Sequence, residues 1–246
     1  MSKKLQFIPA SLLVIVDTVL TGFTGSIEEY NTLVVPTSIT SVGPRAFENA
    51  RSLSTVIIST SVISIENNAF QGCKELSMLT LPLSLTSIGT SAFQGCTKLA
   101  ILVLNAGLTT IASNAFAGCT GLKGLLRIPN TVTSIGSTAF GGCTNISGLL
   151  LGSSVTSIGN AAFINCSGIT GKLAIPNSVT TIHISAFANC TGITGIIFGT
   201  SLKTIENGAF QGCTGIEGTV TIPESVTELG TNLFPVSTTI IKKTGL

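Results

Sequence analysis

The sequence predicts a parallel solenoid, a rod built from about ten short coils that stack on one another. Phenylalanine recurs every 23 or 24 residues, at positions 47, 70, 93, 116, 140, 163, 187, 210 and 234. All seven cysteines lie three residues after one of these phenylalanines, and leucine or isoleucine follows three residues later. A unit of this length cannot bury its own apolar face, so neighbouring coils must stack to form a continuous core.

The first element, residues 1–30, is a degenerate coil that is expected to cap the N-terminal end of the rod. The Ala-Phe pair and the cysteine of the repeat are missing from it. Its apolar residues at the repeat positions are Val14, Val16, Leu20 and Phe23, and its charged residues are Lys3, Lys4, Asp17, Glu28 and Glu29. Leu5–Val16 resembles the apolar run of a signal peptide, but Pro9 interrupts it and no A-x-A cleavage site follows. We therefore expect this segment to stay on the chain.

Residues 31–235 hold the nine repeats, and each repeat is expected to add one short strand to a single parallel sheet. The alternation of Leu102 and Leu104 around Val103 is typical of a strand with one buried face. Coils about 4.8 Å apart would place equivalent residues on top of one another. The expected structural ladder consists of Phe70, Phe93, Phe116, Phe140, Phe163, Phe187 and Phe210 together with Cys73, Cys96, Cys119, Cys143, Cys166, Cys190 and Cys213.

The cysteine ladder allows three interpretations. Neighbouring thiols would lie about 5 Å apart, which is near the Cα separation of a disulfide. An apolar pattern and an odd number of cysteines favour buried, unreactive thiols, because free cysteine packs as a small hydrophobe. Zinc sites need paired ligands at short spacing, and that spacing is absent. Free thiols are expected, with disulfides as the alternative, and no metal or cofactor site is predicted.

A second period lies within the first. Proline follows the strand in alternate coils, at positions 36, 82, 129, 176 and 223, and the coils between carry Ser59, Asn105, Gly152 and Gly199 there. The repeating unit is therefore a pair of coils. This pattern indicates duplication of a two-coil block, with proline placed where no backbone donor is needed. The alternative is that one edge carries a repeat of about 10 Å that matches a regular partner.

The last element, residues 236–246, is expected to be a cap strand, with Thr238–Ile241 added before Lys242 and Lys243. It also holds the apolar residues Val236 and Leu246. Because this segment is shorter than the N-terminal cap, we expect the weaker cap here and self-association through this end.

The composition excludes several classes of function. Charged residues make up 9% of the chain and the net charge is +2, without the clustered basic residues that nucleic-acid binding needs. No run approaches the roughly 18–20 apolar residues of a membrane-spanning helix. With a single histidine, His183 on an exposed turn, no Ser-His-Asp triad is expected, and nucleophile-elbow and phosphate-loop motifs are absent. The sequence predicts no catalytic residue and no enzyme activity.

Pairs of threonine or serine recur in successive coils and predict an uncharged polar surface. The candidate binding residues are Thr86, Ser87, Thr109, Thr110, Thr133, Ser134, Thr156, Ser157, Thr180 and Thr181. When stacked, they would form a flat array of hydroxyl groups that could contact protein or glycan. Threonine is also favoured on strand surfaces because it is β-branched, so one alternative is that these residues only keep the surface soluble. Ice binding is another alternative.

The repeat resembles one known family. Its A-F-x-G-C and I-P-x-S-V-T-S-I-G segments are similar to the BspA-like (Treponema pallidum type) leucine-rich repeat over about residues 31–235. This resemblance implies an α/β leucine-rich-repeat solenoid, a right-handed curved stack with one parallel sheet and with short turns or helical segments on the other side. Family members are similar to surface adhesins of host-associated bacteria and parasitic protists and occur in large DNA viruses. The resemblance implies no catalytic residues.

Together these observations predict a non-enzymatic binding module that contacts protein or glycan at a surface, as an adhesin or host-interaction protein does. An extracellular, cell-surface or virion-associated location is expected with it. The alternative is a structural subunit of a virion, fibre or other assembly that docks through repeat faces or solenoid ends. The low charge and the single solenoid fit both interpretations.

Overall fold

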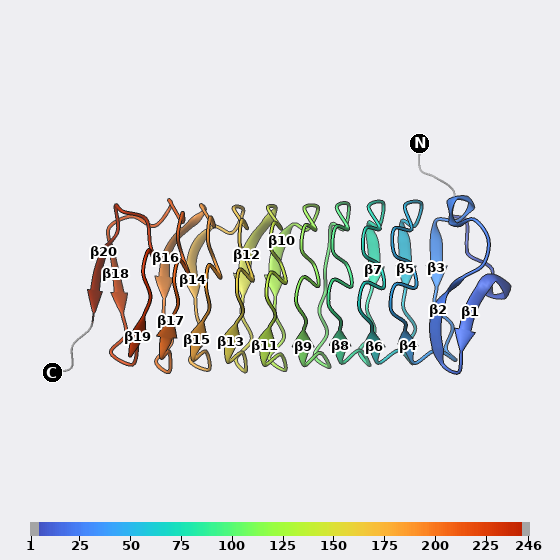
Figure 1. Cartoon of the computed structure of the whole chain (residues 1–246), viewed down its shortest axis with the longest axis horizontal. Helices are drawn as coiled ribbons and strands as arrows, with labels where there is room; N and C mark the ends of the chain where they lie inside the picture. Colours follow the sequence, from blue (N-terminus) through green and yellow to red (C-terminus); the bar gives the residue numbers. More distant parts are fainter. Residues whose placement is uncertain (1–4, 243–246) are drawn as a thin grey trace.

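The computed structural model describes residues 5–242. Figure 1 shows the coils side by side along the long axis, with the chain advancing from one end of the rod to the other. Backbone hydrogen bonds of 2.8 Å join successive coils, as where the N–H of Phe70 donates to the carbonyl of Ala92. The predicted solenoid of about ten stacked coils is confirmed. Lys3, Lys4, Lys243 and Leu246, which the sequence assigned to the caps, lie outside the described residues.

One set of strands forms a sheet of eleven that runs almost the whole length of the rod. Its first pair is antiparallel and every later pair is parallel. In spatial order the strands are β1 (Leu13–Val16), β2 (Val19–Phe23), β4 (Ser41–Val42), β6 (Ser64–Ile65), β8 (Ser87–Ile88), β9 (Thr110–Ile111), β11 (Ser134–Ile135), β13 (Ser157–Ile158), β15 (Thr181–Ile182), β17 (Thr204–Ile205) and β19 (Glu228–Leu229). We call this the large sheet.

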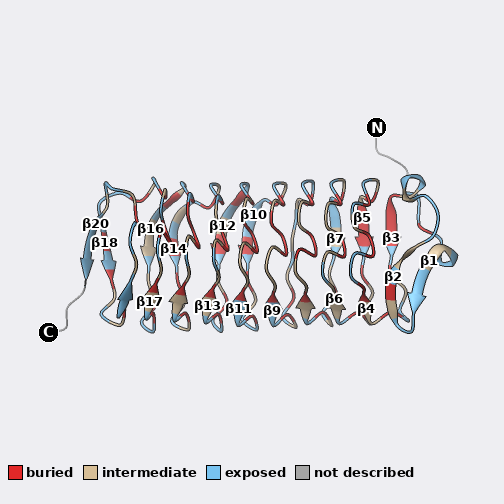
Figure 2. Cartoon of the chain, in the orientation of Figure 1, coloured by how far each residue is buried: buried red, intermediate tan, exposed pale blue. Residues whose placement is uncertain are grey.

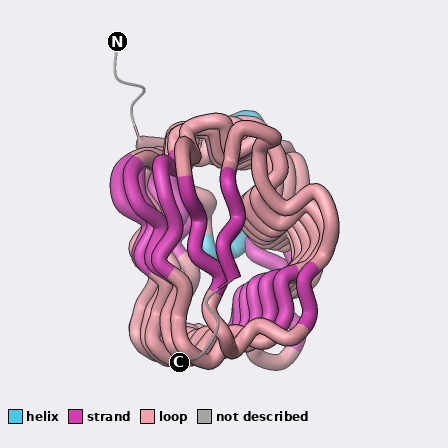
Figure 3. The backbone as a smooth tube through the Cα atoms, turned by 90° about the vertical axis from the view of Figure 1, so that its left-hand side faces the viewer, coloured by secondary structure: helices cyan, strands magenta, loops and turns pink. Residues whose placement is uncertain are grey.

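A second set of strands forms four small parallel sheets on a different side of the coil, as the view along the rod in Figure 3 shows. The first sheet contains β3 (Thr32–Val34), β5 (Thr55–Ile57) and β7 (Met78–Thr80). The other three pair β10 (Gly124–Arg127) with β12 (Ile146–Leu150), β14 (Gly171–Ala174) with β16 (Ile193–Ile197), and β18 (Thr219–Ile222) with β20 (Thr239–Lys242).

The parallel pairing is therefore as expected, but most coils carry two strands instead of one, and the strands belong to five sheets instead of one. Leu102–Leu104, expected to be a strand, forms none, although its side chains keep the alternation: Val103 is exposed and its two neighbours are half-buried. In the described residues the only helices are two short 3₁₀ segments, η1 (Ala10–Leu12) and η2 (Ile27–Glu29), so turns complete each coil.

The core is a continuous column inside the rod, and Figure 2 shows buried stretches that recur from coil to coil along it. Phenylalanine rings stack from Phe47 to Phe234 with centroids 5.2 to 5.5 Å apart and planes tilted by at most 7°. Phe23 from the N-terminal segment extends the stack at 5.8 Å from Phe47. This stacking fixes the register of the coils, and with it the positions of all outward side chains.

Candidate binding surfaces

The threonine and serine residues singled out from the sequence lie along the large sheet. In each pair the first residue is exposed just before a strand, and the second begins the strand and is exposed or half-buried. The following isoleucine points inward and is buried, as Ile135 and Ile158 are. The structure thus brings all ten residues onto one face, which we call the hydroxyl face.

Four of the seven threonine hydroxyls on this face donate to backbone carbonyls of the preceding coil. Thr86 donates to the carbonyl of Ile63 at 3.0 Å, and Thr109 donates to the carbonyl of Thr86 at 3.2 Å. Thr156 and Thr180 make the same bond to the coil before them, at 3.1 and 3.2 Å. Because the hydroxyl hydrogen points into the sheet, the surface presents methyl groups and acceptor lone pairs. Such a surface suits a partner that supplies hydrogen-bond donors.

His183 has a more specific role than the exposed turn residue that the sequence suggested. It is half-buried, and its Nδ1 lies 3.0 Å from Glu206 Oε1 while its Nε2 lies 3.0 Å from Ser157 Oγ. The other oxygen of Glu206 accepts the N–H of Ile184 at 3.0 Å. The network joins three coils and has the Ser-His-carboxylate order of a hydrolase triad, which sequence reasoning missed. The signal that could have revealed it is that Glu206 occupies the same repeat position as His183.

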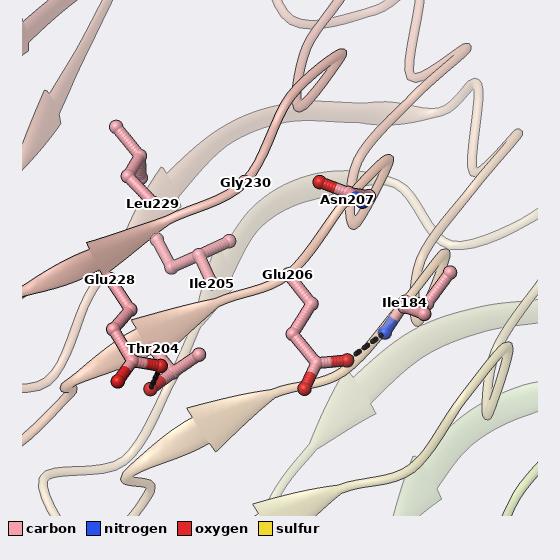
Figure 4. Close-up of a pocket in the computed structure, with 8 residues that line it drawn as sticks. All are labelled: Ile184, Thr204, Ile205, Glu206, Asn207, Glu228, Leu229 and Gly230. Atoms are coloured by element: carbon pink, nitrogen blue, oxygen red, sulfur yellow. Dashed lines mark hydrogen bonds between the residues drawn. The ribbon is translucent and has the colours of Figure 1, made fainter.

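A depression of about 350 Å³ lies beside this network, towards the C-terminal end of the large sheet. Figure 4 shows two carboxylates along it: Glu206 bonded to the backbone N–H of Ile184, and Glu228 3.1 Å from the hydroxyl of Thr204. The remaining lining residues are Ile205, Asn207, Leu229 and Gly230. The hydroxyl face therefore ends in an acidic and partly apolar hollow.

The cysteines lie in the core as free thiols, all seven buried. Each thiol donates to the carbonyl of the phenylalanine in the preceding coil, at 3.1 to 3.3 Å, as Cys119 does to Phe93. Burial raises the pKa of Cys166 and of Cys213 to about 12. No group of three potential metal ligands occurs within residues 5–242.

A second surface, which the sequence pattern does not reveal, runs along the side of the rod that carries the small sheets. Outward positions in five coils carry large apolar side chains that remain exposed: Met78; Ile101 and Val103, which share one coil; Leu125; Leu150; and Ile197. We call this row the apolar stripe. Its most exposed member is Val103, at 73%. Exposed apolar residues that cluster in this way mark interaction surfaces more often than single ones do.

Comparisons with known proteins agree with this architecture. The family model for the BspA type leucine-rich repeat region, in six copies, matches residues 22–126 and 124–241. The chain is similar to the crystal structure of the T. pallidum leucine-rich repeat protein TpLRR, with a TM-score of 0.62 and 24% identity over 86% of this chain and 91% of that one. It is also similar to the pneumococcal vaccine antigen PcpA, with a TM-score of 0.61 and 22% identity over 96% of this chain and 71% of that one.

A search of curated protein sequences gave no match. The identities to the two solved structures are low enough that these likenesses establish the fold alone. Within residues 5–242, no helix has the length and apolar character needed to cross a bilayer.

Proposed function

The chain belongs to the BspA-type leucine-rich repeat family, and from that premise we propose that it is a binding module that contacts protein or glycan at a surface, in an adhesin-like or host-interaction role. Repeat solenoids of this kind are scaffolds whose extended faces bind partners. An extracellular or cell-surface location is part of the proposal. No catalytic, metal or cofactor role is assigned to any residue.

The observation that carries the proposal is the hydroxyl face. From Thr86 to Thr181 five successive coils present the same uncharged pair of side chains. Equivalent residues lie about 4.8 Å apart, and the hydroxyl hydrogens of Thr86, Thr109, Thr156 and Thr180 are directed inward. A partner therefore meets a regular row of acceptors and methyl groups that needs little desolvation of charge. Amide N–H groups and sugar hydroxyls both supply the donors that such a row can accept.

An adhesion assay tests this proposal. Beads coated with the protein are applied to cultured epithelial cells and to a glycan array, and the variant Thr133→Lys/Thr156→Lys is compared with wild type. We expect binding to fall about tenfold or more, because two lysines disrupt the centre of the face. The matched control is Thr144→Lys, an exposed threonine outside the ten residues of the face. Equal binding by both variants would reject the hydroxyl face as the contact surface.

A structural subunit remains the second candidate, and the C-terminal end favours it. All four residues of β20 are exposed, including Ile240 and Ile241, and Val236 beside them is fully exposed. β19 is the last strand of the large sheet and has a neighbour on one side only. Edge strands of this kind can pair with another chain. Light scattering separates the candidates: a monodisperse species near 25.1 kDa supports the binding module, and large ordered particles support the subunit.

A further inference from the structure

The apolar stripe spans six coils of the rod, five of which contribute at least one large apolar side chain. Ile101 and Val103 share one coil, the coil of β14 between Leu150 and Ile197 contributes the exposed Lys172 and Ala174, and each large apolar residue of the stripe is at least 45% exposed. The strand pairs place Leu125 beside Gly148 and Ala174 beside Ile197. Six coils at about 4.8 Å spacing make the stripe roughly 24 Å long, and it is two outward positions of a strand wide, about 7 Å.

Glycine in alternate coils lets long side chains lie flat across this face. A Cβ atom added at Gly148 would come within 3.0 Å of Leu125 Cδ1, and one added at Gly195 would lie 3.5 Å from Lys172 Cγ. Leu125 and Lys172 thus extend over the glycines of the next coil. The same arrangement recurs after one two-coil block, so the two-coil period seen in the sequence also shapes this surface.

The charges within the stripe have a single sign. Arg127 and Lys172 are exposed in β10 and β14, at outward positions of the same strands. No aspartate or glutamate occupies an outward position of the strands from β7 to β16. In the described part of the chain the ion pairs are Arg45 with Glu48, Lys98 with Glu75, and His183 with Glu206, so both stripe cations face solvent. A ligand that complements the stripe must combine apolar groups with negative charge.

The dimensions favour a helix over an extended segment. One helical turn rises 5.4 Å, so an apolar residue at each turn would advance about 27 Å over five turns, against roughly 24 Å for five coil steps. Every second residue of an extended strand advances about 6.8 Å, or roughly 34 Å over the same five steps. The apolar row of an amphipathic helix is also narrow, as the stripe is.

We propose that the apolar stripe is a docking surface for an amphipathic helix of a partner protein, one whose apolar row is flanked by aspartate or glutamate. Leu150 and Ile197 would contact the apolar row, and Arg127 and Lys172 would pair with the flanking carboxylates. This inference goes beyond the proposed function, because it assigns a second face with chemistry different from that of the hydroxyl face.

A peptide titration tests the proposal. The probe is a fluorescent amphipathic peptide of about 18 residues with leucine along one stripe and glutamate on both flanks, followed by anisotropy. Two matched peptides have lysine in place of every glutamate, or the same composition scrambled so that no apolar stripe forms. We expect the glutamate peptide to bind about tenfold more tightly than either, and its affinity to fall as salt is raised.

Variants of the protein locate the contact. Leu150→Ser/Ile197→Ser and Arg127→Glu/Lys172→Glu should each weaken the glutamate peptide about tenfold. Thr133→Val/Thr156→Val alters the hydroxyl face only and should not. The charge-reversal variant changes exposed side chains alone, so it keeps the test valid if the Ser variant folds poorly.

Four results would overturn the proposal: no binding of the glutamate peptide, equal binding of the lysine peptide, equal binding by the stripe variants, or capture of the protein by phosphatidylserine vesicles in place of the peptide. Because the titration uses no cells or glycans, its failure leaves the adhesion proposal untouched, and failure of the adhesion assay leaves this one untouched.

Discussion

Each phenylalanine within the stack, between the end members Phe23 and Phe234, packs between two others, and this position determines how much stability is lost when one is removed. Phe116 is fully buried, with ring neighbours at 5.3 Å on both sides. Phe116→Ala removes a buried ring and leaves a cavity that two flanking coils hold open, so we expect a loss of about 3–5 kcal/mol in the free energy of unfolding. Urea denaturation followed by circular dichroism measures it. Phe7→Ala, at a 53% exposed ring, is the control. A loss below about 1 kcal/mol for Phe116→Ala would mean that the stack is not the stabilising core.

The buried thiols should react slowly in the native protein and rapidly once it unfolds. Cys119, Cys143 and Cys166 are buried, and the side-chain interaction with Cys96, followed by burial, raises the pKa of Cys119. A thiolate is the reactive form, so both access and ionisation are suppressed. Labelling with a maleimide reagent with and without urea measures the difference. Rapid labelling of most cysteines in the native state would contradict the buried ladder.

The same thiols make stability depend on alkaline pH. In the unfolded chain a thiol titrates near its ordinary value of 9.0, whereas burial raises the pKa of Cys166 to about 12. Below pH 9 the thiol is protonated in both the folded and the unfolded state, so it gives the free energy of unfolding no dependence on pH. Above it the unfolded state loses protons first, so each thiol lowers stability by about 1.4 kcal/mol per pH unit until its folded pKa is reached. Cys143→Ala/Cys166→Ala should reduce this slope between pH 9 and 12 relative to wild type, and an unchanged slope would contradict the assignment.

The Ser157–His183–Glu206 network should not act as a hydrolase triad. Ser157 lies within β13, which is paired on both sides, whereas a hydrolase nucleophile sits on a sharp turn beside oxyanion-binding N–H groups. We expect no labelling of Ser157 by a fluorophosphonate probe, measured by mass spectrometry against a serine hydrolase as positive control. Labelling that Ser157→Ala abolishes would show the opposite.

At the scale of the element, the two-coil block reflects one backbone contact. The carbonyl of the proline approaches the residue at the equivalent position of the next coil. In the N-terminal half the residue opposite the proline donates to its carbonyl: Ser59 to Pro36 at 3.0 Å and Asn105 to Pro82 at 2.6 Å. In the C-terminal half glycine takes this position, and a Cβ atom at Gly152 would lie 2.1 Å from the carbonyl oxygen of Pro129. A side chain that donates a hydrogen bond and a glycine without a side chain thus both accommodate the close approach of the next coil to the proline carbonyl.

Substitutions at Gly152 test this explanation. Gly152→Ala must displace the coil and should cost about 1–3 kcal/mol. Gly152→Ser should cost less, because its hydroxyl can donate to Pro129 as Ser59 does to Pro36. Gly148→Ala, which meets only the end of the Leu125 side chain, should be nearly neutral. Urea midpoints of the three variants measure the order, and a serine variant less stable than the alanine variant would contradict it.

Only part of this fold could be predicted from the sequence. The stack of phenylalanines was predictable because a fixed spacing reports directly on equivalent positions. The strands of the large sheet were not, because most hold two residues, as Ser134–Ile135 does, and two residues show no alternation. The apolar stripe was missed because the sequence shows Val103 between two leucines but does not show whether anything covers it. The network of His183 needs three coils in register.

At the scale of the whole molecule, the rod has two unlike sides. The hydroxyl face ends in carboxylates at Glu206 and Glu228, whereas the apolar stripe holds the cations Arg127 and Lys172. A net charge of +2 conceals this separation. Two partners could therefore be held at once, one on each side, and a partner that binds one face should leave the other accessible.

The ends of the rod differ as well. At the N-terminal end, β1 and β2 form an antiparallel hairpin with an irregularity between Val14 and Ile15, which interrupts the edge of the large sheet. At the C-terminal end, β20 covers β18 by a regular parallel pairing, and the N–H of Thr239 donates to Gly218 at 2.8 Å. Irregular edges resist pairing with another chain, and regular ones do not.

Removal of residues 236–246 should therefore promote self-association. It takes away β20, opens the edge of β18, and uncovers Val220 and Ile222, which are 4% and 0% exposed in the intact rod. An open parallel edge beside newly exposed apolar side chains is the template for adding a strand from another copy. Light scattering of the shortened chain over a range of concentrations measures the effect, and Lys98→Ala, a change of exposed charge elsewhere, should leave the particle size unchanged. If the shortened chain stays monomeric and soluble, the coil that ends at Phe234 is already closed without β20. The structural-subunit alternative would then lose the physical argument that supports it, because docking through this end depends on the edge that β20 occupies.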